Sequence, residues 1–187
     1  MRIEFESKMF SIDHAALLII DVQGKLANLV YEKNKIHRNI GSLIEAAKIL
    51  TLPVIYTEQA PEKIGKTIPA IAKHLKKFSP VVKKSFSCCG SMEFLQKLNA
   101  LNRQQIIVCG IETHVCVYQT VMDLLDRRFK LQVVVDAVSS RAKENKDIAL
   151  ERMKIAGALL TSTEMIICEL VRTSEHKNFR EIIKLIK

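Results

Sequence analysis

Short apolar runs alternate along the chain with longer segments in which apolar and polar residues recur at helical spacing. A short, nearly continuous apolar run is typical of a strand that is buried on both faces of a sheet. The predicted strands are 15–20, 53–57, 80–82, 105–110, 131–135 and 159–162. Segments with one apolar face are expected to be helices. They are 33–50, 67–77, 91–101, the residues from about 116 onward, 144–157, 164–171 and 178–186.

This alternation predicts an α/β fold with a parallel sheet covered by helices on both faces and joined by right-handed crossovers. We find no internal repeat, low-complexity stretch or linker, so residues 1–187 are interpreted as one domain. In parallel sheets of this kind, ligands bind beyond the carboxyl ends of the strands. Polar residues that directly follow a predicted strand are therefore the candidates for function.

Length and composition narrow the class of protein. The chain has 187 residues, of which 48% are apolar, and no segment resembles a membrane span of about 18 uncharged apolar residues. Residues Met1–Glu6 lack the apolar core of a signal peptide, and their acidic residues argue against a transit peptide. Five cysteines, an odd number without Cys-x-x-Cys spacing, favour free thiols in a reducing cytoplasm.

The formal charge of +9 suggests an anionic partner, but the excess is concentrated. Residues 62–84 contain seven lysines against Glu62 alone. Aromatic residues make up only 5% of the chain and tryptophan is absent, so platforms for base stacking are scarce. We interpret most of these lysines as solvated helix surface, and the composition argues against nucleic acid as the partner.

Three residues with reactive side chains follow predicted strands: Asp21, Lys83 and Cys116. Each also has an ordinary interpretation, since an aspartate often caps the next helix, a lysine usually faces solvent, and a lone cysteine is often a buried apolar side chain. The carboxyl ends of parallel strands lie at one edge of the sheet, so three coincidences at that edge favour a shared site.

Together, the three residues form a possible cysteine-hydrolase site. Cys116 would be the nucleophile, and its position near a helix start favours the thiolate. Asp21 would accept the thiol proton and return it to the leaving group. Lys83 would hold Asp21 ionised and lower the pKa of Cys116. Backbone N–H groups in residues 112–116 would bind the oxyanion.

Three motifs carry a resemblance to a known family. Leu17–Gln23 combines an apolar strand with Asp21, and Lys83–Ser87 reads as Lys, two variable residues, an aromatic and a small polar residue. Gly110–Val117 is the most specific of the three and contains Cys116. Over residues 12–170 the chain resembles the isochorismatase-like cysteine hydrolases, a superfamily that includes nicotinamidases, pyrazinamidases and N-carbamoylsarcosine amidases.

The resemblance implies a three-layer α/β/α fold with a six-stranded parallel sheet of order 3-2-1-4-5-6. It places Asp21 and Cys116 on neighbouring central strands. It also implies a cis peptide bond between Ile111 and Glu112, which would aim the backbone amides of Glu112 and Cys116 into an oxyanion hole. Members of the superfamily usually assemble into dimers, tetramers or larger rings, so a homo-oligomer is expected.

Departures from the family pattern narrow the range of activities that the resemblance implies. Isochorismatase itself, a vinyl-ether hydrolase, lacks the cysteine, so Cys116 argues against that reaction. Nicotinamidases hold a metal with histidines after the first two strands, whereas residues 23–34 and 58–61 here contain none. We therefore expect no catalytic metal, no cofactor and no nicotinamidase activity. Thr57-Glu58-Gln59 with Pro61 and Gly65 resembles a subgroup whose substrates are mostly unassigned.

The leading hypothesis is a small cytoplasmic hydrolase that cleaves an amide or related acyl C–N bond of a small molecule. Cys116 would attack the carbonyl, Asp21 would protonate the departing amine, and water activated by Asp21 would cleave the thioester. The expected pocket wall consists of Leu26, Glu58, Gln59, Phe86 and Tyr118, with Glu58 and Gln59 as polar selectors.

Two alternatives come from other functional classes. One is a catalytically silent interaction protein that binds anionic partners through the lysines of 62–84. The other is a thiol redox sensor, with Cys116 as the reactive residue and Cys109 or the Cys88–Cys89 pair as the resolving thiol.

Overall fold

The computed structural model describes residues 9–186, so the sequence predictions for Met1–Glu6 lie outside the described residues. Its centre is a six-stranded parallel sheet of order β3-β2-β1-β4-β5-β6, which confirms the order that the family resemblance implied. The strands are β1 (Ala15–Ile20), β2 (Val54–Gln59), β3 (Val81–Lys83), β4 (Gln105–Ile111), β5 (Lys130–Ser139) and β6 (Leu159–Thr161).

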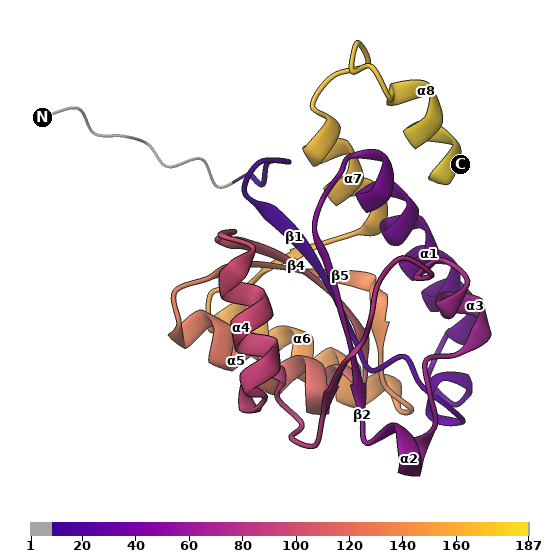
Figure 1. Cartoon of the computed structure of the whole chain (residues 1–187), viewed down its shortest axis with the longest axis vertical. Coiled ribbons are helices and arrows are strands. Elements are labelled where there is room, and N and C mark those ends of the chain that lie inside the picture. The colour runs from indigo at the N-terminus through magenta and orange to yellow at the C-terminus, as the bar shows by residue number, and fades with distance from the viewer. Residues whose placement is uncertain (1–8, 187) are drawn as a thin grey trace, which may run out of the picture.

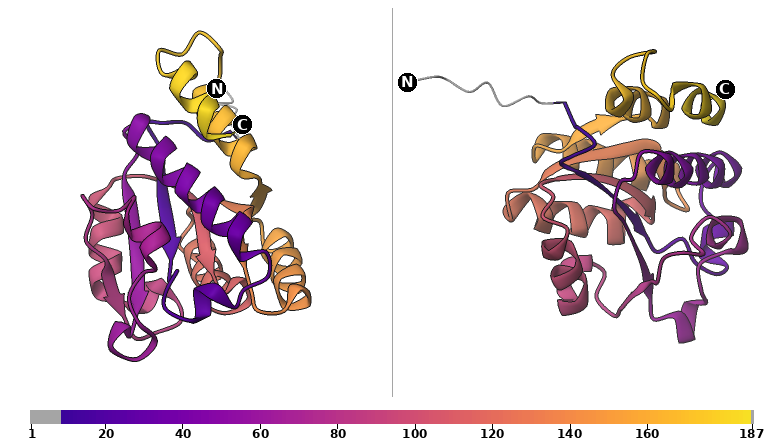
Figure 2. Two further views of the ribbon diagram at one scale, coloured as in Figure 1. Left: turned by 90° about the vertical axis from the view of Figure 1, so that its right-hand side faces the viewer. Right: turned by 45° about the horizontal axis from the view of Figure 1, so that its top comes forward.

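Helices cover both faces of this sheet and give a three-layer α/β/α arrangement (Figure 1). The α-helices are α1 (Lys33–Ile49), α2 (Pro61–Ile64), α3 (Pro69–Ala72), α4 (Met92–Ala100), α5 (Tyr118–Asp126), α6 (Lys143–Ile155), α7 (Thr163–Val171) and α8 (Phe179–Ile182). Helices α4, α5 and α6 lie on one face, and α1 and α7 lie on the other (Figures 1 and 2). Short helical turns complete the chain: η1 (Leu26–Asn28), η2 (Cys88–Gly90), η3 (Thr113–Val117) and η4 (Ile183–Leu185).

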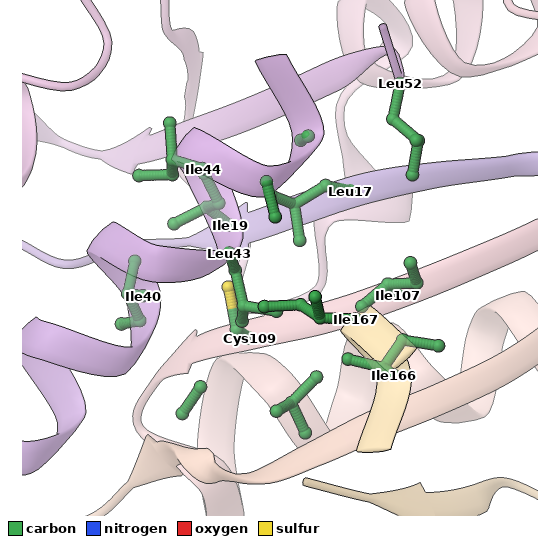
Figure 3. Close-up of a cluster of buried hydrophobic side chains, with 14 of the residues drawn as sticks. Leu17, Ile19, Ile40, Leu43, Ile44, Leu52, Ile107, Cys109, Ile166 and Ile167 are labelled. Carbon is green, nitrogen blue, oxygen red and sulfur yellow. The ribbon is translucent and has the colours of Figure 1, made fainter. Parts of the chain in front are cut away.

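The central strand β1 explains why the fold has three layers. All six of its residues are buried, and successive side chains point to opposite faces of the sheet. Leu17 and Ile19 pack with α1 and α7 (Figure 3), whereas Leu18 and Ile20 pack with the cluster that includes α4, α5 and α6. A strand that is apolar at every position therefore requires helices on both sides.

Gly110 allows β1 and β4 to approach each other at the carboxyl ends of the strands. Its φ is +122°, a conformation that residues with a Cβ rarely adopt. A Cβ at this position would lie 2.1 Å from the backbone oxygen of Ile20. The glycine of the Gly110–Val117 motif is thus needed to bring the end of β4 against the end of β1, directly beside Asp21.

Two strands are longer than the sequence predicted. β2 continues through Glu58 and Gln59, which lie beyond the predicted strand 53–57, because these residues pair in register with Val82 and Lys83 of β3. β5 continues past Asp136 to Ser139, and its last residues pair with the end of β4 beyond a register shift. In both cases strand pairing continues past polar side chains that, in the local sequence pattern, indicate the end of a strand.

Two helical predictions need correction. The segment 67–77 forms only the single turn α3, preceded by the unpredicted turn α2. Gly65 ends α2, Thr67 forms an isolated bridge with Gln23, and Ile68 is extended. The segment 178–186 divides into α8 and η4. Within residues 9–186, no helix has the length and apolar character needed to cross a membrane.

Candidate active site

Asp21 and Lys83 form a buried ion pair at the carboxyl edge of the sheet. Asp21 follows β1 in a left-handed conformation with φ of +50°, and Lys83 is the last residue of β3. The Nζ atom of Lys83 lies 2.6 Å from Oδ2 of Asp21, and both side chains are at least 97% buried. The predicted pairing of these two residues is therefore present in the structure, although β2 separates their strands.

Each charge of the pair has further hydrogen-bond partners. Lys83 Nζ also donates to the backbone oxygens of Ser85 and Phe86, both at 3.0 Å, so it has three acceptors for its three protons. The hydroxyl of Thr57 donates to Oδ1 of Asp21 at 2.7 Å. Buried charges that are paired and hydrogen-bonded in this way keep a fixed geometry. The interpretation of Lys83 as a solvent-facing lysine is excluded.

Cys116 lies in the π-helical turn η3, immediately before α5. Its side chain is almost completely covered, at 6% exposure, and packs in the hydrophobic cluster beneath β1 and β4. Its Sγ donates to Oε1 of Gln59 at 3.2 Å, and the negative charge of the Asp21 carboxylate acts on the thiol. Asp21, Lys83 and Cys116 are thus brought together, with Gln59 as a fourth member.

The pKa of the Cys116 thiol is raised, opposite to the sequence expectation. Burial is the largest cause, and the negative charge of Asp21 adds to it, while Lys83 acts in the lowering direction but does not offset the two. The resting sulfur is therefore a neutral thiol that carries its own proton. Any nucleophilic role requires proton transfer to a neighbouring base when a substrate arrives, and Asp21 is the carboxylate in position.

The turn that carries Cys116 is anchored through the side chain of Glu112. The peptide bond between Ile111 and Glu112 is cis. The buried carboxylate of Glu112 accepts from the backbone N–H of Arg141 at 3.0 Å and from its Nε at 3.1 Å. Glu112 therefore ties the turn that carries Cys116 to the connection between β5 and α6. The sequence had suggested a role only for its backbone amide.

The predicted pocket residues separate into different roles. Gln59 contacts the thiol, whereas Glu58 is 95% buried and accepts from the backbone N–H and the hydroxyl of Thr67, both at 2.7 Å. Glu58 therefore holds the loop after β2, and its expected role as a polar selector stays a prediction. Phe86 is 52% exposed beside the site, and its backbone contacts Lys83.

Leu26 and Tyr118 are partly buried against opposite hydrophobic clusters. Leu26 packs with the cluster under α1, whereas Tyr118 packs with the cluster that contains Cys116. The guanidinium of Arg152 lies 4.8 Å from the centre of the Tyr118 ring, a cation–π contact. Only Tyr118 of these two shares the hydrophobic cluster of Cys116.

The other cysteines are placed unequally around Cys116. Cys109 belongs to the cluster under α1, on the opposite face of the sheet (Figure 3), so it cannot serve as a resolving thiol for Cys116. Cys88 shares the cluster of Cys116, and its Sγ lies 3.9 Å from the hydroxyl of Thr57. Burial raises the pKa of Cys88 to about 12, so it is unreactive as a thiolate near neutral pH.

Three residues of the site were not assigned a role from the sequence. Thr57 and Gln23 are buried polar side chains that bond to Asp21 and to the backbone of Gln59, and Arg141 holds Glu112. Gln23 belongs to the first motif and Thr57 to a predicted strand, so polar residues at buried strand ends were the available signal. Across residues 9–186, no group of three or more His, Cys, Asp or Glu side chains is arranged to hold a metal ion.

Comparison with known proteins places this geometry in a family. A profile of the isochorismatase domain matches residues 15–165, from the first strand to the start of α7. The chain belongs to the isochorismatase family. Isochorismatase domain-containing protein 2 of Danio rerio is 36% identical over 173 residues, which cover 92% of this chain and 86% of that protein.

Solved structures agree with the isochorismatase assignment. The structure of MAR1 Ribonuclease from Caenorhabditis elegans superposes with a TM-score of 0.89 at 40% identity, covering 95% of this chain and 92% of that one. YcaC from Pseudomonas aeruginosa, with hexane-2,5-diol and covalent acrylamide, superposes with a TM-score of 0.90 at 26% identity, covering 97% and 93%. The isochorismatase-like fold therefore extends over nearly the whole chain.

Proposed function

We propose that this protein is a cysteine hydrolase that cleaves an amide or related acyl C–N bond of a small molecule. The observation that carries the proposal is the convergence of Asp21, Lys83 and Cys116 at the carboxyl edge of the sheet. The Lys83–Asp21 pair is closed at 2.6 Å, and the Asp21 charge acts on the thiol of Cys116. A nucleophile, a base and an orienting cation are the minimum set for this chemistry.

The reaction begins with proton transfer. The neutral thiol of Cys116 gives its proton to Asp21 as Sγ attacks the carbonyl carbon, so the thiolate forms only during attack. Lys83 keeps its contact with Asp21 and limits the change in charge. The backbone amides of Glu112 and Cys116 stabilise the oxyanion. Glu112 stays in place because Arg141 holds its side chain.

The second half of the reaction returns the proton. Asp21 protonates the departing amine, which leaves an acyl group on Sγ as a thioester. Water, deprotonated by Asp21, then attacks the thioester and releases the acid and the free thiol. Support from relatives is indirect: the YcaC structure from Pseudomonas aeruginosa contains covalent acrylamide, an electrophilic small amide.

The test is ammonia release from a panel of primary carboxamides, ureas and N-carbamoyl compounds. We expect wild type to turn over at least one class, and Cys116→Ala and Asp21→Asn to lose activity by at least about a thousandfold. Cys168→Ala, which changes an exposed cysteine on α7, is the matched control and should keep full activity. Equal activity in wild type and Cys116→Ala would contradict the proposal.

A second candidate function is binding of nucleic acid through the exposed lysines of residues 62–84, which exclude the buried Lys83. The observations that favour it are the net charge of +9 and the relative from Caenorhabditis elegans, which is named a ribonuclease. Binding of a 20-nucleotide RNA should then weaken steeply between 50 and 200 mM salt, and it should survive Cys116→Ala. RNA binding that is undetectable at 50 mM salt would remove this candidate.

We also propose a cytoplasmic location and a homo-oligomer, a dimer or tetramer. All five cysteines are free thiols, four of them buried, which suits a reducing compartment. Cell fractionation tests the location directly. Recovery of the protein with an intermolecular disulfide from an oxidising compartment would contradict it.

A further inference from the structure

The carboxamide of Gln59 is oriented toward the nucleophile by its own hydrogen bonds. Gln59 is the last residue of β2, and its Nε2 donates to the backbone oxygen of Lys84 at 3.3 Å. A carbonyl oxygen only accepts, so the NH₂ group must face Lys84 and the oxygen must face away. That oxygen lies 3.2 Å from Sγ of Cys116. An acceptor therefore points at the attacking atom.

A second glutamine fixes the backbone of Gln59. Gln23 is fully buried two residues after Asp21; its Oε1 accepts from the N–H of Gln59 at 2.6 Å. Its Nε2 donates to the backbone oxygens of Gln59 at 3.2 Å and Gly65 at 2.6 Å. Because the backbone and the side chain of Gln59 are both bonded, the acceptor has a fixed position beside the thiol.

The groups around the sulfur define which atoms a substrate can present. A carbonyl carbon bonded to Sγ carries its oxygen and one leaving group. The oxygen needs hydrogen-bond donors, and Lys83 has already used its three protons on other acceptors. Gln59 Oε1 only accepts, so a leaving group on its side needs a hydrogen to donate. An ester oxygen or a fully substituted nitrogen has no hydrogen to donate, so its lone pair would face the lone pairs of the acceptor.

We propose that Gln59 determines substrate specificity by accepting a hydrogen bond from the N–H of the scissile nitrogen. The substrate class is then primary or singly substituted carboxamides and carbamoyl compounds, and it excludes esters and fully substituted amides. The inference rests on the proposed nucleophilic role of Cys116. It adds that the oxygen of Gln59 accepts first from the thiol of Cys116 and then from the N–H of the substrate.

Cyanate provides a probe with the required atoms. The sulfur of Cys116 adds to the carbon of isocyanic acid, the thiol proton moves to its nitrogen, and the C–N double bond becomes single. The adduct is Sγ–C(=O)–NH₂, with an N–H at the proposed position. The comparison reagent is 4-nitrophenyl acetate, which loses 4-nitrophenolate and leaves Sγ–C(=O)–CH₃, with a methyl group there. Peptide mapping of Cys116 gives both rates.

The readout is the ratio of the carbamoylation rate to the acetylation rate, because a general change in thiol reactivity cancels in it. In Gln59→Leu the ratio should fall about tenfold, the loss of one hydrogen bond to a neutral acceptor. Gln59→Glu keeps an oxygen at the same place and should retain the ratio within about threefold. Gln96→Leu, the same change at an exposed position of α4, should leave the ratio unchanged.

The possible failures can be told apart. A ratio that is the same in wild type and Gln59→Leu overturns the role of Gln59 while leaving Cys116 as a nucleophile. A ratio that falls equally in Gln59→Glu, with native circular dichroism, also overturns it, because an acceptor is still present. If Cys116 of wild type takes up neither group, the proposed function fails and the inference fails with it.

Discussion

The buried pair of Asp21 and Lys83 makes a specific residue-level prediction about stability. Neither charge is accessible to water, so removal of one partner leaves the other uncompensated. Lys83→Met should lower the free energy of unfolding by about 3–5 kcal/mol. Chemical denaturation of the single and double variants measures this loss.

The double variant Asp21→Asn/Lys83→Met provides the control for this pair. It removes both charges, so it should be more stable than the sum of the two single losses predicts, by about 1–3 kcal/mol. Strictly additive losses would mean that the two side chains do not depend on each other for their stability.

The Glu112–Arg141 contact predicts a kinetic effect at a distance from the reacting atoms. Arg141 is exposed on one side, and its Nε holds the carboxylate of Glu112 while its backbone N–H gives a second bond. Arg141→Gln should retain the backbone bond and the fold but lower kcat about tenfold, because the amide of Glu112 is less firmly placed. Steady-state kinetics on an active amide should show little change in KM; a rise in KM alone would place Arg141 in substrate binding instead.

At the level of elements, Gly110 allows β4 and β1 to approach each other, and a second glycine serves as its control. Gly110→Ala combines an unfavourable positive φ with a clash against the Ile20 backbone, and should cost at least about 3 kcal/mol. Gly157 has φ of +109° but no heavy atom within 4 Å of the place that a Cβ would take, so Gly157→Ala should cost about 1–2 kcal/mol. Thermal unfolding compares them, and equal losses would contradict the clash.

The elements also show how far the sequence carries the fold. The central strands and the long helices α1, α4 and α6 were predictable because burial imposes an apolar pattern on their own residues. The ends of β2 and β5 were not. Gln59 and Asp136 are polar residues in strands, and their partners, Gln23 and Thr163, are distant in sequence. Local patterns contain no information about such partners.

The candidate site likewise has features that the sequence could predict and features that it could not. Asp21, Lys83 and Cys116 could be proposed because each follows an apolar run and matches a motif. The raised pKa of Cys116 could not, because it depends on how deeply the thiol is buried and how close Asp21 lies. The bonds of Glu58 were not predictable for the same reason: its carboxylate accepts from Thr67, nine residues away, and no local pattern indicates this contact.

At the scale of the whole molecule, the buried thiols make the free energy of unfolding vary with pH in the alkaline range. The pKa values of Cys88 and Cys109 are raised by burial above the unfolded value of about 8.5. Below pH 8.5 both states keep the proton and the stabilisation is complete. Above it the unfolded thiol ionises, so the free energy of unfolding falls by up to about 1.4 kcal/mol per pH unit for each thiol.

Cys109→Ala isolates one of these thiols. The variant should be less stable than wild type at every pH because the substitution leaves a cavity. Between pH 9 and 11, however, its free energy of unfolding should fall less steeply than that of wild type, by about 1.4 kcal/mol per pH unit. Cys168→Ala, at an exposed position, should change the slope less. Parallel curves for wild type and Cys109→Ala in urea titrations would contradict the buried, protonated state of this thiol.

The free edge of the sheet bears on the proposed assembly. Strand β6 ends the sheet, and Leu159 on it and Ile155 at the end of α6 are 43% and 79% exposed. Apolar side chains at such an edge favour association with a second copy. Light scattering should give a mass of two or four chains, and Ile155→Glu/Leu159→Glu should reduce it; a wild-type mass of one chain would contradict the proposal.

The central claim is that Cys116 becomes acylated during turnover. The most direct measurement is rapid acid quench of enzyme mixed with an amide that releases ammonia, followed by mass spectrometry of the peptide that contains residue 116. The account predicts the acyl mass on Cys116 of wild type, formed within the first turnover and at least about a thousandfold more slowly in Asp21→Asn. Ammonia release at the full rate without any acyl group on Cys116 would contradict it.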